Sequence, residues 1–208
     1  MPDFIYLASQ SPRRLQLLEQ WGARCELLLP DDQEDAESLE AVLPGEAPAA
    51  YVQRVTALKL AAALDRLRRR GLPPAPVLCA DTTVALGRRI LGKPQSSTEA
   101  RAMLGDLSGR EHRVLTAVAV GQLAGRASRG RRSWSALSVS RVRFDVLTPT
   151  QIRRYVATGE PMGKAGAYAI QGRAALWTTK IHGSYSGIMG LPAHETAQVL
   201  AAAGIVLV

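Results

Sequence analysis

The spacing of apolar and polar residues predicts a chain of short strands and helices. Apolar runs at 4–8, 77–86 and 113–120 have the length of buried strands, and 137–146 roughly alternates polar with apolar residues. From 49 to 70, hydrophobic residues recur at the spacing of a helix with one buried face. Further strands are expected at 26–29, 90–91 and 174–181, and further helices at 12–21, 99–107, 148–157 and 194–203. Because strands and helices do not alternate strictly, the pattern predicts an α/β fold with a sheet of mixed strand directions.

The first predicted helix begins with a pair of arginines. Ser11 is suited to the N-cap and Pro12 to the first helical position, which places Arg13 and Arg14 in the first turn. Basic residues there oppose the helix dipole, which favours anions at that end. A bound anion therefore explains the pair better than helix stability does.

The predicted strand at 77–86 carries a carboxylate in its middle. A buried, ionised Asp81 needs a metal, a cationic partner or a raised pKa, because an isolated buried charge is very costly. An edge position, or hydrogen bonds to nearby backbone, would be a purely structural alternative. A turn and the short strand at 90–91 complete a hairpin that brings Lys93 beside the Asp81 strand.

Two later segments are expected to be loops. Small residues at 161–172 allow the backbone to approach a ligand closely, and Gln171 offers both hydrogen-bond donors and acceptors. The glycine-rich stretch at 183–192 is expected to be a second loop, and Thr98 is suited to cap the helix at 99–107. His112 and His182 are expected at polar loop or edge positions.

Several cations and two carboxylates are spread along the predicted sheet. The cations are Arg13, Arg14, Lys59, Lys93 and Lys164, and the carboxylates are Glu34 and Asp81. Cations bind phosphate oxygens, whereas carboxylates hold hard divalent metals or activate a water molecule. The chain has no zinc-type histidine spacing, no GxSxG elbow and no Walker A motif. The residues by themselves thus favour a metal-assisted enzyme that acts on phosphates.

Composition agrees with one globular domain over residues 1–208. Hydrophobic residues make up 47% and charged residues 21%, a mixture that excludes disordered and coiled-coil chains. No apolar run reaches the length of about 18 residues that a membrane span needs. The first residues lack the features of a signal peptide, and Cys25 and Cys79 form no CxxC motif, so a cytoplasmic protein is expected.

The net charge of +8 is unevenly distributed. Six arginines and no acid lie between 126 and 143, a segment expected to begin as a loop, and four more arginines lie at 66–70. A solvated loop and a helix end explain these clusters without any function, the second through the helix dipole. A surface that binds nucleic acid is the alternative. It is disfavoured because Trp134 is the only aromatic residue interleaved with these arginines and no known motif is present.

Seven motifs, in order, resemble those of the Maf family of nucleoside triphosphate pyrophosphatases. They are Leu7-Ala8-Ser9 with Ser11-Pro12-Arg13-Arg14, Ala80-Asp81-Thr82, Gly92-Lys93-Pro94, Leu107-Ser108-Gly109, Lys164-Ala165-Gly166-Ala167-Tyr168, Ile170-Gln171-Gly172 and Gly190-Leu191-Pro192. The similarity runs from Ile5 to about Glu195, nearly the whole chain. The resemblance implies a fold related to the inosine triphosphate pyrophosphatases, in which a long curved mixed sheet separates two lobes around a central cleft. It also implies a homodimer.

The resemblance further implies a reaction and a set of roles. A nucleoside triphosphate would be hydrolysed to the monophosphate and pyrophosphate with Mg²⁺ or Mn²⁺. Asp81 would be the general base, and Glu34 together with Asp81 would hold the metal. Ser9, Arg13, Arg14, Lys59, Lys93 and Lys164 would bind the triphosphate and stabilise the transition state. The family has also been linked to arrest of septum formation.

Three positions indicate the branch of the family. Arg13, Thr82 and Gln171 resemble the branch that cleaves dTTP and UTP, and a glutamine amide can pair with a uracil or thymine edge. The branch that cleaves 7-methyl-GTP is the alternative within the family. The chain departs from the family pattern at Gln33, where an acidic residue usually precedes Glu34. It departs again at Gly163, where the family usually has Asp.

Overall fold

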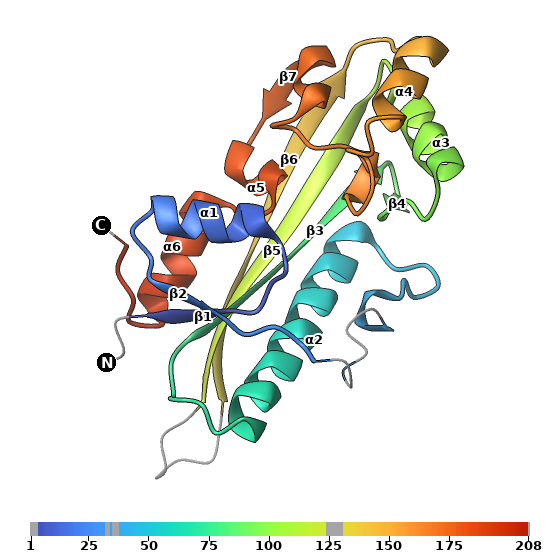
Figure 1. Ribbon diagram of the computed structural model, residues 1–208. Coiled ribbons are helices and arrows are strands. Elements are labelled where there is room, and N and C mark those ends of the chain that lie inside the picture. Colours follow the sequence, from blue (N-terminus) through green and yellow to red (C-terminus); the bar gives the residue numbers. More distant parts are fainter. Residues whose placement is uncertain (1–3, 32–33, 35–37, 124–130, 208) are drawn as a thin grey trace.

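The computed structural model describes residues 4–31, 34, 38–123 and 131–207 (Figure 1). The strands are β1 (Ile5–Leu7), β2 (Cys25–Leu27), β3 (Val77–Leu86), β4 (Arg89–Leu91), β5 (Glu111–Leu123), β6 (Arg131–Phe144) and β7 (Thr178–His182). The α-helices are α1 (Pro12–Gln20), α2 (Pro48–Arg69), α3 (Ser97–Leu107), α4 (Pro149–Val156), α5 (Tyr185–Met189) and α6 (Ala193–Ala202). Short 3₁₀ turns are η1 (Ser38–Glu40), η2 (Ala165–Ala167) and η3 (Arg173–Trp177).

One sheet joins all the described strands, in the order β2-β1-β3-β5-β6-β7, with β4 paired to β3. β1 runs parallel to β2 and β3, and the remaining pairs are antiparallel. The predicted α/β fold with mixed strand directions is therefore confirmed. No helix in the described part of the chain combines the length and apolar character that crossing a membrane requires.

Helices cover both faces of the sheet (Figure 1). Cys79 on β3 packs against α2, whereas Leu78 and Ala80 pack with α1 and α6. Side chains along a strand point alternately to opposite faces, so Asp81 faces the α2 layer and Thr82 faces the other. The separate contacts of Asp81 with α2 and of Thr82 with α1 agree with this alternation.

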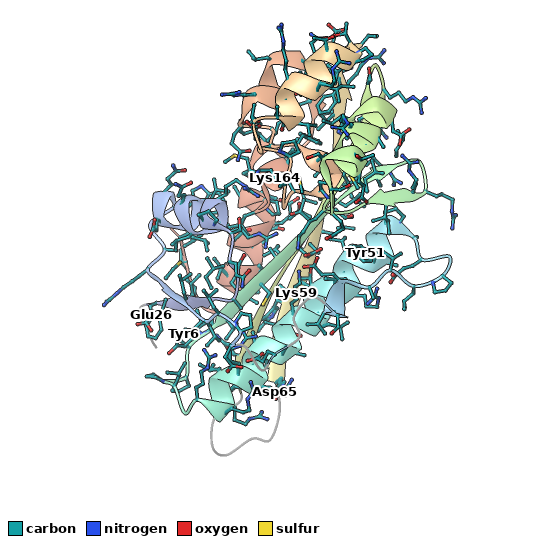
Figure 2. All side chains as sticks on the ribbon, turned by 45° about the vertical axis from the view of Figure 1, so that its right-hand side comes forward. Tyr6, Glu26, Tyr51, Lys59, Asp65 and Lys164 are labelled. Atoms are coloured by element: carbon teal, nitrogen blue, oxygen red, sulfur yellow. The ribbon has the colours of Figure 1, made fainter. Side chains whose placement is uncertain are left out.

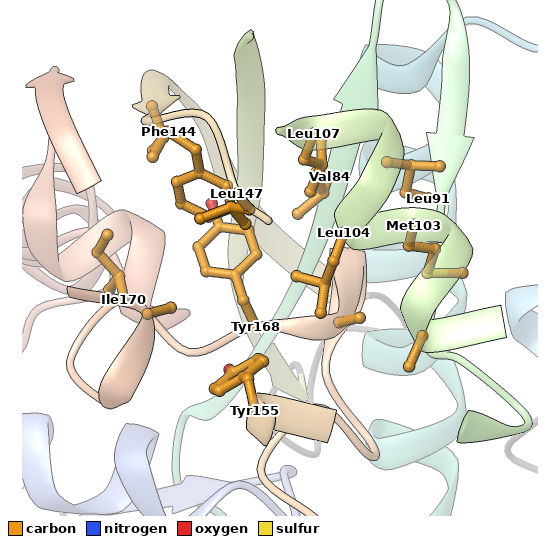
Figure 3. Close-up of a cluster of buried hydrophobic side chains, with 14 of the residues drawn as sticks. Val84, Leu91, Met103, Leu104, Leu107, Phe144, Leu147, Tyr155, Tyr168 and Ile170 are labelled. Atoms are coloured by element: carbon orange, nitrogen blue, oxygen red, sulfur yellow. The ribbon is translucent and has the colours of Figure 1, made fainter. Parts of the chain in front are cut away.

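A third cluster of buried side chains fills the far end of the sheet, between α3, α4 and the segment around η2 (Figure 3). Phe144 and Tyr168 meet edge to face with ring centroids 4.8 Å apart, and Tyr155 and Trp177 do the same at 4.8 Å. Such pairs contribute about 0.5–1.5 kcal/mol beyond the area they bury. This packing fixes the chain on either side of the 161–172 loop.

The sequence signals for helix ends are correct for α1 and wrong for the cap of α3. Pro12 starts α1 and Gly22, with φ +80°, follows its end, as predicted. The predicted cap Thr98 is wrong, because Ser96 accepts the hydrogen bond from the backbone N–H of Glu99 at 3.1 Å. Since these two residues have similar side chains and lie two positions apart, composition alone could not separate them.

Several predicted boundaries are wrong where long-range pairing decides them. β6 begins at Arg131, so part of the expected arginine loop is a strand, because it pairs with β5 along the whole hairpin. Arg126 and Arg129 lie outside the described residues. The strand expected at 174–181 is split into η3 and β7, and the loop expected at 183–192 contains α5, capped by Ser184. His112 is not at a polar edge: it is buried on β5 beside Phe144 and Tyr168.

Candidate active site

A cavity of about 990 Å³ opens beside β3. Between Cys79 and Thr83, β5 is the only described strand that pairs with β3, because β1 pairs before this stretch and β4 after it. On its other side, this stretch of β3 has no described partner strand. That open edge of β3 faces the space between α1 and α2. Nine of the ten predicted site residues line the cavity: Ser9, Arg13, Arg14, Glu34, Lys59, Asp81, Thr82, Lys93 and Lys164.

Gln171 is the predicted residue that does not line this cavity. It is exposed and follows Ile170, whose side chain belongs to the far core cluster. Lys59 and Lys164, by contrast, reach the cavity from different parts of the fold, α2 and the segment before η2 (Figure 2).

Asp81 has the cationic partner that its burial requires. Its residue is 8% exposed, and its Oδ1 accepts a hydrogen bond from Lys59 Nζ at 2.6 Å. The predicted cationic partner and the alternative edge position both hold in part. Asp81 pairs with Lys59, and it also lies where one side of β3 has no described partner strand. The ion pair offsets part of the cost of placing this carboxylate in a largely buried site.

Lys59 bridges two carboxylates from the α2 layer. Its Nζ donates to Asp81 Oδ1 at 2.6 Å and to Glu40 Oε1 at 2.6 Å. Burial opposes the charged form of Lys59, but Asp81 and Glu40 outweigh it and raise the pKa of this lysine. The hydrophobic periodicity of α2 would place Lys59 on a solvent-facing side. Its contacts with Asp81 and Glu40 show instead that its side chain points into the cavity.

Glu40 is a site residue that sequence reasoning missed. Besides Lys59, it binds Lys93, whose Nζ lies 3.0 Å from Oε1 and 2.8 Å from Oε2. Burial tends to raise the pKa of Glu40, but the two lysines outweigh it and lower that pKa. The chain around it holds many acids and no local feature that singles out this one.

Glu34 is held by two arginines of α2. Arg66 donates through Nε and Nη2 to the two carboxylate oxygens at 2.8 and 2.6 Å, and Arg69 donates to Oε1 at 2.8 Å. The hydrogen bonds from Arg66, above all, lower the pKa of Glu34. Arg66 is only 4% exposed and also donates to the Leu28 carbonyl, so the solvated helix end expected for 66–70 is wrong for this residue.

Arg14 is a partly buried cation whose hydrogen-bond partners among the described residues are neutral groups. It donates to the Gly190 carbonyl at 2.8 Å, to Ser9 Oγ at 3.0 Å and to Thr82 Oγ1 at 3.4 Å. Arg13 donates to the Met189 carbonyl at 3.3 Å. Burial is the main cause that lowers the pKa of both guanidinium groups. Because these hydrogen-bond partners are neutral, the positive charges of Arg13 and Arg14 are available to an anion.

Lys164 completes the cationic wall. It donates to the Glu160 carbonyl at 2.5 Å, and burial followed by the Arg13 charge lowers its pKa. Among the described residues, no carboxylate lies within ion-pair distance of Arg13, Arg14 or Lys164. The cavity lining as a whole has six Lys or Arg side chains and four Asp or Glu side chains, a surplus of two positive charges. Such a lining suits a polyanionic ligand.

Comparison with known proteins identifies the family. The model of the family described as "Maf-like protein" matches residues 4–203. The chain belongs to the Maf family. It is 64% identical to a protein of Polaromonas sp. named "dTTP/UTP pyrophosphatase", over 98% of this chain and 97% of that one. A protein of Albidiferax ferrireducens with the same name is 63% identical over 98% of each chain.

Solved structures add less. A HAM1 protein from Coxiella burnetii superposes with a TM-score of 0.39 and 14% identity, over 67% of this Maf chain and 72% of the other. This similarity is too low to define the fold, which is defined instead by the sheet topology described above.

The donors in this Maf chain suit a cation that the substrate helps to bind. Among the described residues, no group of three or more His, Cys, Asp or Glu side chains is gathered as a ready-made metal site. Mg²⁺, however, usually takes one or two carboxylates and completes its shell with water and substrate phosphates. Asp81, on the wall of a cavity suited to phosphates, fits that kind of site. To bind the metal, Glu34 would have to give up a hydrogen bond to Arg66 or Arg69.

Proposed function

We propose that this chain is a nucleoside triphosphate pyrophosphatase that hydrolyses dTTP and UTP to the monophosphate and pyrophosphate. The observation that carries the proposal is the Asp81–Lys59 pair on the wall of a cavity whose Arg13, Arg14 and Lys164 have no carboxylate partner among the described residues. Membership of the Maf family and the names of its relatives support the same reaction.

The cationic wall would bind the triphosphate. Arg13 and Arg14 present guanidinium groups from the first turn of α1, at the end of a helix that already attracts anions. Lys93, Lys164 and the Ser9 hydroxyl would contact the remaining phosphate oxygens. Because charge moves onto the leaving pyrophosphate during the reaction, these groups would stabilise the transition state more than the bound substrate.

Asp81 would act as the general base. It would take a proton from a water molecule as the water oxygen bonds to the α-phosphorus and the bond from that phosphorus to the bridging oxygen breaks. The ion pair with Lys59 orients the Asp81 carboxylate, as a base must be oriented. Asp81, with Glu34, would hold Mg²⁺ or Mn²⁺, which when bound supplies further positive charge to the phosphates.

Three residues would select the pyrimidine nucleotides. Arg13 and Thr82 line the cavity, and Thr82 is fixed by hydrogen bonds with Arg14 and with Thr116. Gln171 is exposed and outside the cavity lining, and its amide would have to reach the base of the bound nucleotide. Gln171→Glu should impair dTTP and UTP more than purine nucleotides, whereas an equal loss for all bases would refute its role.

The test is product analysis on a panel of nucleoside triphosphates with Mg²⁺ or Mn²⁺, with pyrophosphate separated from phosphate. Monophosphate and pyrophosphate should appear, fastest from dTTP and UTP. Asp81→Asn should lower turnover by at least about a hundredfold and leave nucleotide binding largely intact. A preference for 7-methyl-GTP would overturn the branch, and no turnover of any nucleotide would overturn the activity.

We also infer that the chain acts in the cytoplasm as a homodimer, as the family resemblance implies. Light scattering coupled to size-exclusion chromatography should give twice the chain mass of 22.3 kDa. A monomer at micromolar concentration would contradict the dimer. Nucleic acid is not among the proposed partners, because the arginine clusters match no known nucleic-acid-binding motif and Trp134 is the only aromatic residue between Arg126 and Arg143.

A further inference from the structure

The C-terminal end of α5 holds both arginines of the cavity. Arg13 Nε donates to the Met189 carbonyl at 3.3 Å, and Arg14 Nε donates to the Gly190 carbonyl at 2.8 Å. The last carbonyls of a helix have no partner within the helix, so they can accept hydrogen bonds of this kind. Because a guanidinium group is a rigid plane, the positions of these two carbonyls fix the directions of both groups.

Hydroxyl groups of the sheet bind α5 at both of its ends. At the start, Ser140 Oγ on β6 accepts a hydrogen bond from the Ser184 backbone N–H at 2.9 Å. At the end, Thr116 Oγ1 on β5 donates to the Gly187 carbonyl at 2.8 Å. Thr116 is 1% exposed and lies outside the cavity lining. Any effect of Thr116 on a bound nucleotide must therefore pass through other residues.

The Thr116 hydroxyl has one proton to donate, and this fixes the direction of a short chain of hydrogen bonds. Its proton goes to the Gly187 carbonyl, so its oxygen accepts from Thr82 Oγ1, directly opposite on β3, at 2.9 Å. Thr82 has then used its own proton, and its oxygen accepts from Arg14 Nη2 at 3.4 Å, the longest of these contacts. The chain thus leads from Arg14 through two threonines to α5, whose Gly190 carbonyl binds Arg14 again.

We propose that Thr116 is a positioning residue that orients Arg13 and Arg14 for the binding of phosphate. It does so by tying Thr82 and the end of α5 to one point of the sheet. This inference rests on the proposed function, in which the two arginines bind the triphosphate. Without the Thr116 hydroxyl, the Gly187 carbonyl and the Thr82 proton lose these partners, so both guanidinium groups are held less firmly.

The variant Thr116→Val removes the hydroxyl and keeps the size and branching of the side chain. Pyrophosphate should bind about tenfold more weakly, a change of about 1.4 kcal/mol, which is the size of one net hydrogen bond. Thr116→Ser keeps the hydroxyl and should bind pyrophosphate as the wild type does. Thr196→Val is the matched control, because Thr196 on α6 is 0% exposed, lies outside the cavity lining, and has a hydroxyl without a hydrogen-bond partner among the described residues.

The experiment is calorimetric titration of each full-length variant with metal-free sodium pyrophosphate, after urea unfolding has shown that the variant is folded at the assay temperature. Weaker binding by Thr116→Val, with Thr116→Ser and Thr196→Val unchanged, supports the inference. A folded Thr116→Val with wild-type affinity overturns it, as does an equal loss of affinity in Thr116→Ser. Should Thr116→Val not fold, Thr116→Ala removes the same hydroxyl and is judged by the same two outcomes.

A double-mutant cycle shows whether the effect passes through the arginines. If Thr116 acts by orienting Arg14, Thr116→Val should weaken pyrophosphate binding less in an Arg14→Ala background than in the wild type, because coupled residues are not additive. A loss of the same size in both backgrounds would assign the effect to a general loosening of the fold and would overturn the positioning role.

The two proposals fail separately. Binding of pyrophosphate does not require turnover, so a wild-type protein that binds pyrophosphate but releases none from any nucleotide would contradict the proposed function alone. A wild-type protein that hydrolyses dTTP, with pyrophosphate affinity that Thr116→Val leaves unchanged, would contradict the role of Thr116 alone. A wild-type protein with no affinity for pyrophosphate also overturns the role of Thr116.

Discussion

Replacing Lys59 with methionine should destabilise the protein at neutral pH, because it leaves two carboxylates without their shared cation. Breaking a buried ion pair costs about 3–5 kcal/mol, whereas an exposed pair contributes about 0–1 kcal/mol. The side chains of Lys59, Asp81 and Glu40 are 21%, 11% and 26% exposed, which lies between these limits. We therefore expect the free energy of unfolding to fall by about 2–3 kcal/mol.

The pH dependence of this loss has a defined sign. The folded pKa of Glu40 lies below its ordinary value of 4.5, so the stability from this group is present above pH 4.5 and is lost as the pH falls through the folded pKa. The folded pKa of Lys59 lies above 10.5, so its contribution is present below that pH and is lost as the pH rises through the folded pKa. The difference between wild type and Lys59→Met should therefore stay constant from about pH 6 to 9 and narrow below about pH 4.5.

Urea unfolding followed by tryptophan fluorescence, at several pH values, measures this difference. Lys180→Met is the control, because Lys180 is exposed on β7 and outside the cavity lining. Its effect should stay within about 0.5 kcal/mol. A loss below about 1 kcal/mol for Lys59→Met at pH 7.5 would refute the reasoning, as would a loss that does not shrink on acidification.

Three further changes test other parts of the structure. Arg66→Met should lower the free energy of unfolding by about 3 kcal/mol, since it leaves the largely buried Glu34 carboxylate with Arg69 alone and removes the hydrogen bond to the Leu28 carbonyl. Urea unfolding measures this loss, and a neutral result would contradict the pairing. Gly166→Ala should cost about 2 kcal/mol or more and weaken triphosphate binding through the neighbouring Lys164, because φ is +68° and an added Cβ would lie 2.8 Å from Val84 Cγ2; full stability and affinity would show that the backbone adapts. Burial lowers the pKa of His112 from 6.5 to about 4, so this residue should make stability fall as the pH drops from 6.5 to 4. His112→Gln should flatten that slope in a series of thermal melts, and an unchanged slope would assign it to other groups.

Interactions between near neighbours were the easiest to predict. The helix predicted over 148–157 is α4, whose start is fixed by a capping box between Thr148 and Gln151, only three positions apart. The start of α1 depends on Pro12 at the first helical position, and the side chain of Ser11 forms no capping hydrogen bond there. Where two neighbouring residues have the same chemistry, as Ser96 and Thr98 do, the choice between them depends on the exact path of the chain.

The residues of the candidate site also fall into two groups, those that local sequence features single out and those that they do not. Residues with distinctive chemistry in an unusual setting do line the cavity: an acid inside an apolar strand, at Asp81, and an arginine pair in a first helical turn, at Arg13 and Arg14. Glu40 and Arg66 were missed, because each stands among several residues of the same type. Their contacts alone distinguish them from those neighbours.

The sequence by itself determined the α/β class, the order of most elements, the Maf family and nine of the residues that line the cavity. Local periodicity, capping and ordered motifs carry that information, and none of them depends on contacts between distant parts of the chain. Only the tertiary structure decided which charges meet. Glu40 lies 19 positions from Lys59 and 53 from Lys93. The three gather because α2 packs on β3, the Glu40 backbone is bound to α2, and β4, just before Lys93, pairs with β3. Ion pairs act over a few ångströms, so they follow the folded path of the chain rather than its linear order.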